Sequence, residues 1–415
     1  MRRYTLASSF TAFGGAINAV AIPLVGMFSA TLSPFKLGVL VSIEQIAWLM
    51  VGLPAGVWID RWQRRRVVVV AQMGRAILIA AIPAMIVLDL LSFWTLAMTG
   101  LAVGFCEVFG GIAQAALIPE IVSADRLVEA NSRINAMQTA TSLSGSATVG
   151  PVISLLGAPA ALLLDSLASL SSSALIRSIK VETRVVRHRI SFRRELLDGI
   201  KLIAREPLFR TLTIGGVLFN GFMAAQYVLC FVFLRDLGVE RAWFGLVLAA
   251  SGVGALTGSL LVTMLLRRWR DASIWRFFLV AGPAVGVLVP MASRGWGLAF
   301  YVVGSFGMSC AVAVSSIIGF TARQTACASE MLGRTSSAVR VLTWGAIPVG
   351  ASLGGWVGGL VGSRSALWIV AALFFLEPLI VRCTSLWRWR EFSARSGGPS
   401  PAVAAQPATA MSGAG

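Results

Sequence analysis

The chain has 415 residues, of which 57% are hydrophobic and only 13% are charged. Soluble domains carry about 25% charged residues, so this composition excludes an ordinary soluble protein and makes lipid the solvent for most of the chain. The formal net charge of +17 would suggest a nucleic-acid partner in a soluble protein. Here the basic residues form short clusters between apolar runs, which is the pattern of membrane topology.

Twelve apolar stretches are long enough to cross a bilayer, since a span needs about 20 mostly apolar residues. The first follows a basic start, and without a clean small-residue cleavage pattern it indicates a transmembrane helix rather than a secretory signal. The predicted spans are centred on residues 8–28, 37–58, 67–89, 94–116, 134–156, 159–179, 210–232, 243–265, 274–292, 296–319, 339–361 and 365–384. The sequence therefore predicts an all-α membrane protein.

The basic residues are distributed unequally between the two sides of the membrane. If the N-terminus is inside, the external loops hold only Lys36, Arg235, Arg241, Arg294 and Arg364. The positive-inside rule then predicts that both termini are cytoplasmic. Arginine greatly outnumbers lysine, and alanine is abundant, as is typical of GC-rich bacterial genomes. The predicted location is therefore a bacterial plasma membrane.

A basic segment at residues 181–209 divides the chain into two parts of six spans each, residues 1–180 and 210–385. The segment is expected to be a cytoplasmic linker with an amphipathic helix on the membrane surface. Residues 386–415 are rich in Ala, Gly, Ser and Pro, which predicts a disordered cytoplasmic tail.

The two six-span parts resemble one another. Residues 143–156 read SGSATVGPVISLLG and residues 344–359 read WGAIPVGASLGGWVGG. Both are helices rich in small residues at equivalent positions, and each is followed by a short external turn. Duplicated halves are typical of transporters whose substrate site lies between the halves, near the bilayer midplane.

The loop between the second and third spans carries the motif GVWIDRWQRRR, which resembles the cytoplasmic loop motif of the major facilitator superfamily. The matching residues are Gly56, Asp60, Arg61, Arg64 and Arg65, and Gln63 stands in place of the second loop glycine. The glycine permits close approach of helices, and the arginines anchor the loop inside. Asp60 is expected to pair with a neighbouring arginine or with a helix N-terminus of the other half. In the family this contact acts as a conformational latch, and a plain positive-inside loop is the alternative.

The resemblance covers roughly residues 5–385 and implies twelve transmembrane helices in two pseudo-symmetric six-helix bundles. Residues 116–136, 233–261 and 333–350 resemble the drug and siderophore exporters of that superfamily, related to enterobactin and macrolide exporters. The fifth span partly resembles the antiporter helix of the family: Gly150 and Pro151 match, whereas Ser146 replaces the first glycine. Pro151 removes a backbone donor and allows a bend. Ordinary packing of small residues is the alternative.

Four acids fall inside predicted spans, where an ionised group costs at least ~2.5 kcal/mol and needs a reason. The superfamily resemblance implies that spans one, four, seven and ten line a central cavity. Glu107 in span four is therefore the first candidate for proton carrier or cation contact, and a structural partner is the alternative. Glu44 and then Asp165 are the further candidates for proton coupling or substrate contact, although a structural hydrogen bond to a neighbouring helix is the favoured role of Asp165. Glu377 is predicted to be peripheral, with no transport role.

Two basic residues complete this picture. Arg75 in span three is expected to join the loop motif with Asp60 or to reach the interface. The only histidine, His188, lies in the linker, so carboxylates must carry any coupled protons.

Polar and aromatic residues on the same cavity-lining spans suit an amphipathic or aromatic ligand. The predicted cavity residues are Asn18 on span one and Phe219, Asn220, Gln226 and Tyr227 on span seven. Packing against lipid or helices is the alternative for each phenylalanine.

The sequence thus predicts a monomeric secondary transporter that exports small hydrophobic or amphipathic compounds, such as a drug, an antibiotic or a siderophore. Transport would proceed by proton antiport with alternating access. A facilitative uniporter or importer, and a transporter-derived regulatory or scaffold protein, are the alternatives. The sequence has no Walker loop, no GxSxG and no paired metal-binding histidines, and its five cysteines are scattered. We therefore expect neither an enzyme nor an ATP-driven pump, and no cofactor, metal or nucleic acid.

Overall fold

The computed structural model describes residues 1–59, 62–122, 127–179, 200–326, 329–389 and 392, and among these residues there is no β-strand. The helices of the N-terminal half are α1 (Arg2–Phe28), α2 (Pro34–Ile59), α3 (Arg64–Val87), α4 (Phe93–Ile121), α5 (Leu127–Leu156) and α6 (Ala158–Arg177). Those of the C-terminal half are α8 (Pro207–Asp236), α9 (Arg241–Leu266), α10 (Asp271–Gly286), α11 (Leu288–Met291), α12 (Leu298–Ala326), α13 (Ser329–Val361), α14 (Ser363–Leu373) and α15 (Leu376–Arg382).

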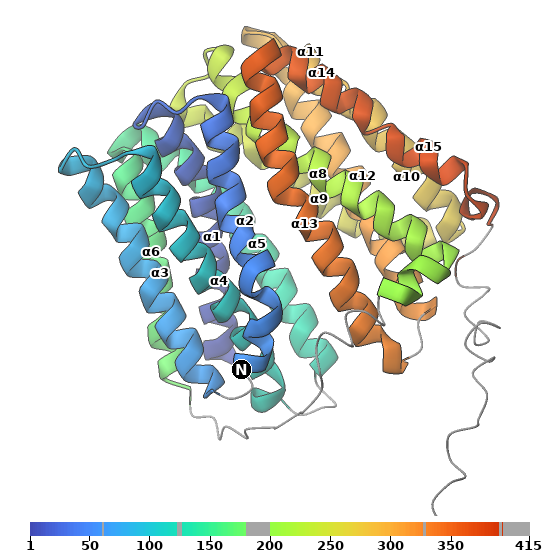
Figure 1. Ribbon diagram of the computed structural model, residues 1–415, viewed down its shortest axis with the longest axis horizontal. Coiled ribbons are helices and arrows are strands. Elements are labelled where there is room, and N and C mark those ends of the chain that lie inside the picture. Colours follow the sequence, from blue (N-terminus) through green and yellow to red (C-terminus); the bar gives the residue numbers. More distant parts are fainter. Residues whose placement is uncertain (60–61, 123–126, 180–199, 327–328, 390–391, 393–415) are drawn as a thin grey trace, which may run out of the picture.

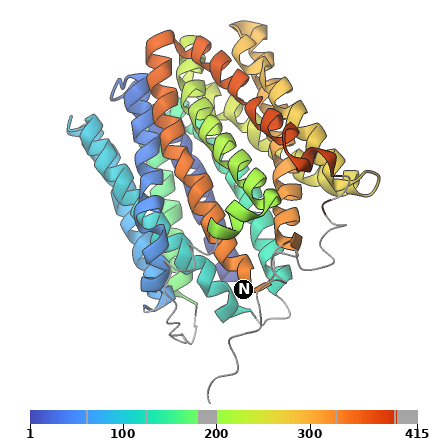
Figure 2. The same cartoon turned by 45° about the vertical axis from the view of Figure 1, so that its right-hand side comes forward.

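The helices form two bundles that stand side by side, α1–α6 and α8–α15 (Figure 1). In the N-terminal half α1 packs on α5 and α6, and α3 packs on α4 and α6. In the C-terminal half α8 packs on α13 and α14, and α12 packs on α9 and α10. The long helices of both bundles run roughly along one common direction (Figure 2). This is the all-helical, two-bundle architecture that the sequence predicts.

Eleven helices of the described residues are long and apolar enough to cross a membrane, one fewer than the twelve predicted spans. The helix that does not qualify is α5, although it runs without interruption over Leu127–Leu156 and packs on α1. Its sequence is rich in Ser, Thr and Gly, which keep its average apolarity below that of its neighbours. The protein is therefore a multi-pass membrane protein.

Two of the spans in the C-terminal half are broken into two helices each. The α10–α11 span breaks at Val287, between Pro283 and Pro290. The α14–α15 span breaks at residues 374–375, four residues before Pro378. A proline removes one backbone hydrogen bond and its ring clashes with the carbonyl four residues earlier, so these positions interrupt the helix.

The last span of each half begins in the same way, which reflects their duplication. Gly157 precedes α6 with φ of 83°, and Gly362 precedes α14 with φ of 85°. Glycine adopts this left-handed conformation at little cost, so each residue allows a tight turn from the preceding helix.

Two seams join the halves: α2 packs on α13, and α5 packs on α9. At the first seam Gly38 lies against the backbone of Ala351, and Gly355 lies against that of Pro34, with no room for a Cβ atom at either glycine. The Ser42 hydroxyl donates to the Pro348 carbonyl at 2.8 Å. Small residues thus permit a close approach of two helices from different halves.

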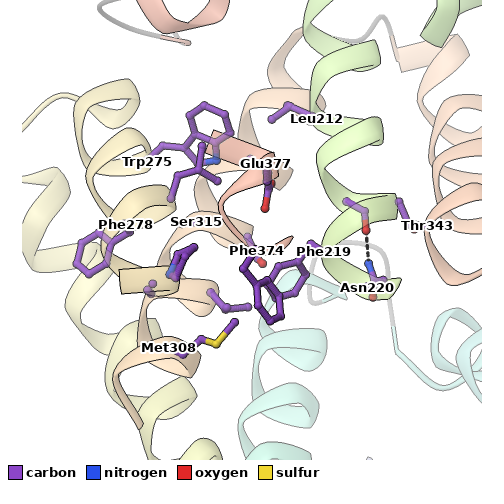
Figure 3. Close-up of a pocket in the computed structure, with 18 of the residues that line it drawn as sticks. Leu212, Phe219, Asn220, Trp275, Phe278, Met308, Ser315, Thr343, Phe374 and Glu377 are labelled. Carbon is purple, nitrogen blue, oxygen red and sulfur yellow. Dashed lines mark hydrogen bonds between the residues drawn. The ribbon is translucent and has the colours of Figure 1, made fainter. Parts of the chain in front are cut away.

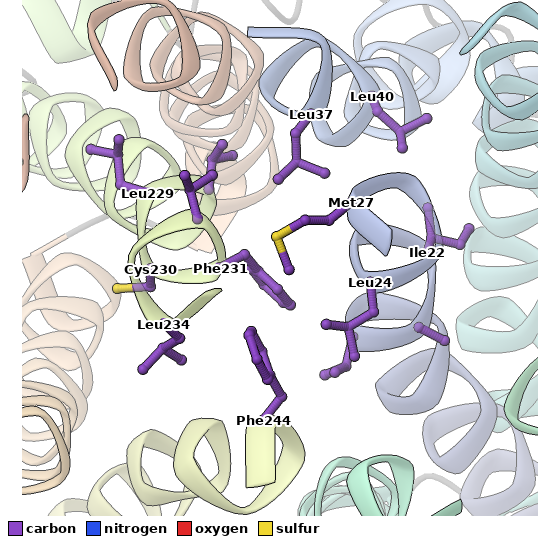
Figure 4. Close-up of a cluster of buried hydrophobic side chains, with 14 of the residues drawn as sticks. Ile22, Leu24, Met27, Leu37, Leu40, Leu229, Cys230, Phe231, Leu234 and Phe244 are labelled. Carbon is purple, nitrogen blue, oxygen red and sulfur yellow. The ribbon is translucent and has the colours of Figure 1, made fainter. Parts of the chain in front are cut away.

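A buried apolar cluster seals the halves near the N-terminal end of α2 (Figure 4). It contains Ile22, Leu24 and Met27 of α1, Leu37 and Leu40 of α2, Leu229, Cys230, Phe231 and Leu234 of α8, and Phe244 of α9. At the opposite end, where the N-terminus lies, the lower ends of α8 and α13 diverge from the N-terminal half (Figure 1). The molecule is closed at one end.

Candidate functional site

An ion pair lies in the core of the N-terminal half. Arg75 of α3 faces Asp165 of α6, and two pairs of their atoms, Nη1–Oδ1 and Nη2–Oδ2, are 2.9 Å apart. The exposed fractions of the two side chains are 3% and 0%. Arg75 also donates to the Ser169 hydroxyl at 2.7 Å. Arg75 therefore lies inside the bundle, and the sequence-based expectation that it joins the loop motif or reaches the interface is wrong.

Two further acids surround this arginine. The Glu107 Oε1 atom of α4 is 3.4 Å from Arg75 Nε, and the side chain of Glu107 is 35% exposed. Glu44 of α2 is half-buried and interacts electrostatically with Glu107, Arg75 and Asp165. Its Oε1 atom has no hydrogen-bond partner among the described residues. We call Glu44, Arg75, Glu107 and Asp165 the charged cluster.

Polar side chains of α1 border the charged cluster. The Gln72 amide donates to the Thr11 hydroxyl at 3.2 Å, and that hydroxyl lies 2.9 Å from the Ser172 hydroxyl. Asn18 is buried, and its Oδ1 atom has no hydrogen-bond partner among the described residues. The cluster thus extends through polar groups from α2 to α6, and its acid Glu107 is partly exposed.

A glycine on α1 makes room for the buried acid. A Cβ atom at Gly14 would collide with Asp165 Oδ1 and would lie 3.3 Å from Arg75 Nη1. The close approach of α1 to α6 thus depends on the missing side chain at Gly14.

The described residues of the loop motif bind within the N-terminal half. Arg64 Nη1 donates to Glu120 Oε1 at 2.8 Å and to the Ala116 carbonyl at 3.1 Å. Arg65 Nη1 donates to the Ile179 carbonyl at 2.8 Å. These contacts hold the start of α3 against the ends of α4 and α6. The backbone of Gly56 is part of α2, whereas Asp60 and Arg61 lie outside the described residues.

A cavity of ≈ 270 Å³ lies in the C-terminal half, between α8, α10, α12, α13 and the α14–α15 span. Of the predicted cavity residues, Phe219 and Asn220 line it. Glu377 lines it as well (Figure 3). From the sequence, Glu377 is expected to have no transport role, because its span is peripheral. The available signal was Pro378, which breaks the span and so places Glu377 in the first turn of α15.

The remaining predicted residues lie elsewhere. Tyr227 donates through its hydroxyl to the Ala19 carbonyl, so it joins α8 to α1 between the halves. Gln226 faces a second, much smaller pocket beside Phe374. Gly150 and Pro151 are inside α5, and Pro151 is exposed without ending the helix.

Comparison with known proteins identifies the family. Residues 4–348 match the model of the Major Facilitator Superfamily. A relative from Sinorhizobium fredii (strain NBRC 101917 / NGR234), the uncharacterized MFS-type transporter y4rN, is 25% identical over 266 residues. That match covers 62% of this chain and 63% of the relative.

Solved structures with the same fold include a nucleoside transporter and a homologue of an iron transporter. The nucleoside transporter NupG matches with a TM-score of 0.72 and 14% identity, covering 93% of this chain and 98% of that one. A bacterial homologue of the iron transporter ferroportin in an inward-facing state matches with a TM-score of 0.69 and 18% identity, covering 91% and 98%. At these identities the similarity shows the fold alone.

Proposed function

The chain belongs to the major facilitator superfamily of membrane transporters, and on that premise we propose that it exports small amphipathic compounds in exchange for protons. The charged cluster is the observation that carries this proposal. The export direction is supported by the resemblance of the fifth span to antiporter helices and of several stretches to drug and siderophore exporters.

The charged cluster combines three acids with a single arginine. Because Asp165 already pairs closely with Arg75, ionisation of both Glu44 and Glu107 would leave two uncompensated negative charges in a medium of low dielectric constant. Such charge is costly inside a membrane protein unless it is neutralised. Binding of protons at Glu107 or Glu44 removes that cost, so the cluster is suited to load and release protons.

Glu107 is the acid best suited to exchange protons with water. Its side chain is 35% exposed, whereas that of Arg75 is 3% exposed. Its 3.4 Å contact with Arg75 is longer than the 2.9 Å contacts between Arg75 and Asp165. Glu107 is therefore the proposed coupling residue, and Asp165 is the structural partner that fixes Arg75.

The conformation fits an alternating-access cycle. If both termini are cytoplasmic, the apolar cluster around Phe231 and Phe244 closes the external end. The close seam at Gly38 and Gly355 must then separate when the transporter faces outward. Rocking of the halves about a site between them is the expected motion.

The proposal is tested with inverted membrane vesicles whose interior has been acidified. Lipophilic cations, macrolides and siderophores are added one at a time, and release of the pH gradient is followed with a fluorescent amine. We expect at least one compound to release protons in the wild type. Glu107→Gln should slow that release at least about tenfold, which corresponds to ~1.4 kcal/mol.

Glu107→Asp is the matched control because it keeps a titratable group at the same position. It should retain substrate-dependent proton release, and both variants should elute like the wild type in size-exclusion chromatography. Full proton release by Glu107→Gln would move the coupling site to Glu44. Transport of a compound without any proton release would instead establish a facilitative uniporter.

A further inference from the structure

The C-terminal cavity has a composition that selects a ligand class. Aromatic side chains of two helices and of one helix break surround it: Trp275 and Phe278 of α10, Phe219 of α8, and Phe374 at the break after α14. Among them lies one carboxylate, Glu377 (Figure 3). Pockets for small molecules are lined mostly by apolar groups, with a few polar groups that fix the orientation of the ligand.

Glu377 has no counter-charge among the residues that the structure describes. No ion pair or hydrogen bond joins its carboxylate to any of them. Arg323 lines the same cavity. It lies two helical turns beyond Ser315 on α12, about 12 Å along the axis, and forms no ion pair with Glu377 within the described part of the chain. A half-buried acid among apolar groups, as here, requires a proton or a cation.

A second polar group of the cavity is also unsatisfied. The hydroxyl of Ser315 is buried without a hydrogen-bond partner within the described residues, although most hydroxyls in these helices donate to a carbonyl of the preceding turn. Ser315 lines the cavity together with Glu377. The Glu377 carboxylate and the Ser315 hydroxyl can thus both accept hydrogen bonds from one donor group of a ligand in the cavity.

The other half of the molecule shows what such an acid pairs with. Asp165 lies on the last span of its half, against a glycine of the first span, and Arg75 of the third span pairs with it. Glu377 likewise lies on the last span of its half, against Gly215 of α8, although it is seven residues deeper into that span than Asp165 is into α6. Gly282 is as far from the start of α10 at Asp271 as Arg75 is from the start of α3 at Arg64. In the N-terminal half the guanidinium group of Arg75 fills the space beside the acid. In the C-terminal half the space beside the acid is a cavity.

We propose that the C-terminal cavity binds an amphipathic organic cation, with the ligand's ammonium group on Glu377 and its apolar body among the aromatic side chains. The ammonium takes the place that Arg75 occupies beside Asp165, and Ser315 accepts a second hydrogen bond from it. The aromatic faces of Trp275, Phe278 and Phe374 contribute contact area and cation–π attraction. This inference rests on the proposed function, because it names the substrate class that the exporter carries.

The cavity is placed to communicate with the space between the halves. Trp344 of α13 forms part of its wall and packs edge-to-face on Trp48 of α2, with ring centroids 5.2 Å apart. Arg340 covers both rings, at 5.3 Å from the Trp48 centroid and 4.2 Å from that of Trp344. A ligand that displaces Trp344 therefore acts directly on the α2–α13 seam.

The proposal is tested by equilibrium dialysis of the purified full chain in detergent with 1-naphthylmethylamine and its neutral isostere 1-naphthylmethanol. The two probes differ only in the ammonium group. We expect the amine to bind at least tenfold more tightly than the alcohol. In Glu377→Gln this preference should disappear while the affinity for the alcohol is retained. Asp89→Asn, which removes an exposed acid, is the matched control and should keep the preference.

A second measurement uses the wild type alone, so it does not depend on the folding of a variant. Dicyclohexylcarbodiimide modifies carboxyl groups in apolar surroundings, and mass spectrometry of the peptide containing Glu377 reports the adduct. The amine should protect Glu377 from modification and the alcohol should not. Equal affinity for both probes, an unchanged preference in Glu377→Gln, or equal protection by both probes would overturn the proposal.

These experiments distinguish the ligand site from proton coupling because they apply no gradient. Binding of the amine at Glu377 without proton release in vesicles would leave the site in place and refute the antiport mechanism. Proton release with another class of compound, without selective binding of the amine, would refute the site and leave the antiport mechanism in place.

Discussion

Each half of the molecule places one acid of its last span against a glycine of its first span, and the two acids meet different surroundings. Asp165 is fully buried and held by Arg75 at 2.9 Å. Glu377 faces a cavity of ≈ 270 Å³ lined with aromatic side chains. The same architecture therefore contains a filled site in one half and an open one in the other.

This difference shows how a duplicated fold divides its tasks. A buried acid whose cation belongs to the chain is a fixed structural element, because neither partner can leave without exposing the other to an apolar interior. A buried acid without such a cation depends on protons or ligands. We infer that the N-terminal half supplies the coupling machinery and that the C-terminal half supplies the ligand contact.

The largest effect is expected from removal of the internal cation. Arg75→Met keeps an unbranched apolar chain but leaves Asp165 without its partner. Loss of one member of a buried ion pair typically costs about 3–5 kcal/mol. The midpoint temperature of unfolding in detergent should therefore fall strongly. It can be measured by heating the protein with a fluorescent dye that does not react with cysteine thiols, or by light scattering.

The double variant Arg75→Met with Asp165→Asn checks the origin of this loss. Since it removes both charges, it should recover a large part of the stability that Arg75→Met loses. If the double variant is as unstable as the single one, packing around Arg75 rather than the charge of Asp165 accounts for the effect, and the comparison with Glu377 loses its basis.

The second largest effect, on ligand binding, is expected when an arginine is introduced beside Glu377 in the C-terminal cavity. Gly282→Arg places a guanidinium group on the wall of the cavity, eleven residues into α10 as Arg75 is eleven residues into α3, and we expect it to pair with Glu377 across the cavity. Occupation of the cavity should weaken binding of 1-naphthylmethylamine at least about a hundredfold, or ~2.8 kcal/mol. Dialysis measures this change directly. A Cβ atom at this position would lie 3.0 Å from the Ala311 Cβ atom, so a slight shift of α12 is required.

Gly282→Met is the matched control, because it adds a chain of similar reach without a charge. It should fill the cavity and reduce the affinities for the amine and the alcohol alike. Gly282→Arg should differ by removing the preference for the amine. If Gly282→Arg binds the amine as the wild type does, the two positions are not equivalent.

More of the fold than of the candidate functional site could be predicted from the sequence. Long apolar runs, basic loops and repeated small-residue helices depend on local composition, and they predict the two bundles correctly. The span predicted at 134–156, which brings the total to twelve, is less apolar than the other spans because Ser, Thr and Gly interrupt it. The structure describes a continuous helix there, α5.

Contacts between distant spans could not be predicted in the same way. No local pattern indicates that Arg75 turns toward Asp165, which follows it by 90 residues. The position of Glu377 on the cavity wall was missed because a family-level rule about peripheral spans was applied to a span that Pro378 breaks. The sequence named the acids of the charged cluster correctly as unusual, since charge inside a span always needs a partner, but packing alone decides which partner each one has.

The smallest effect compares the two glycines that face these acids. In Gly14→Ala the new methyl group would collide with Asp165 Oδ1 and would approach Arg75 Nη1, and neither atom can move without breaking the ion pair. In Gly215→Ala the methyl group would lie 2.6 Å from Glu377 Oε1, the end of a side chain that can turn into the cavity. Overpacking of a tight core costs about 1–3 kcal/mol, so Gly14→Ala should destabilise the protein in detergent more than Gly215→Ala by ~1 kcal/mol. An equal loss in both variants would mean that Glu377 is held as rigidly as Asp165, and its cavity would then be a packing defect rather than a site that admits a ligand.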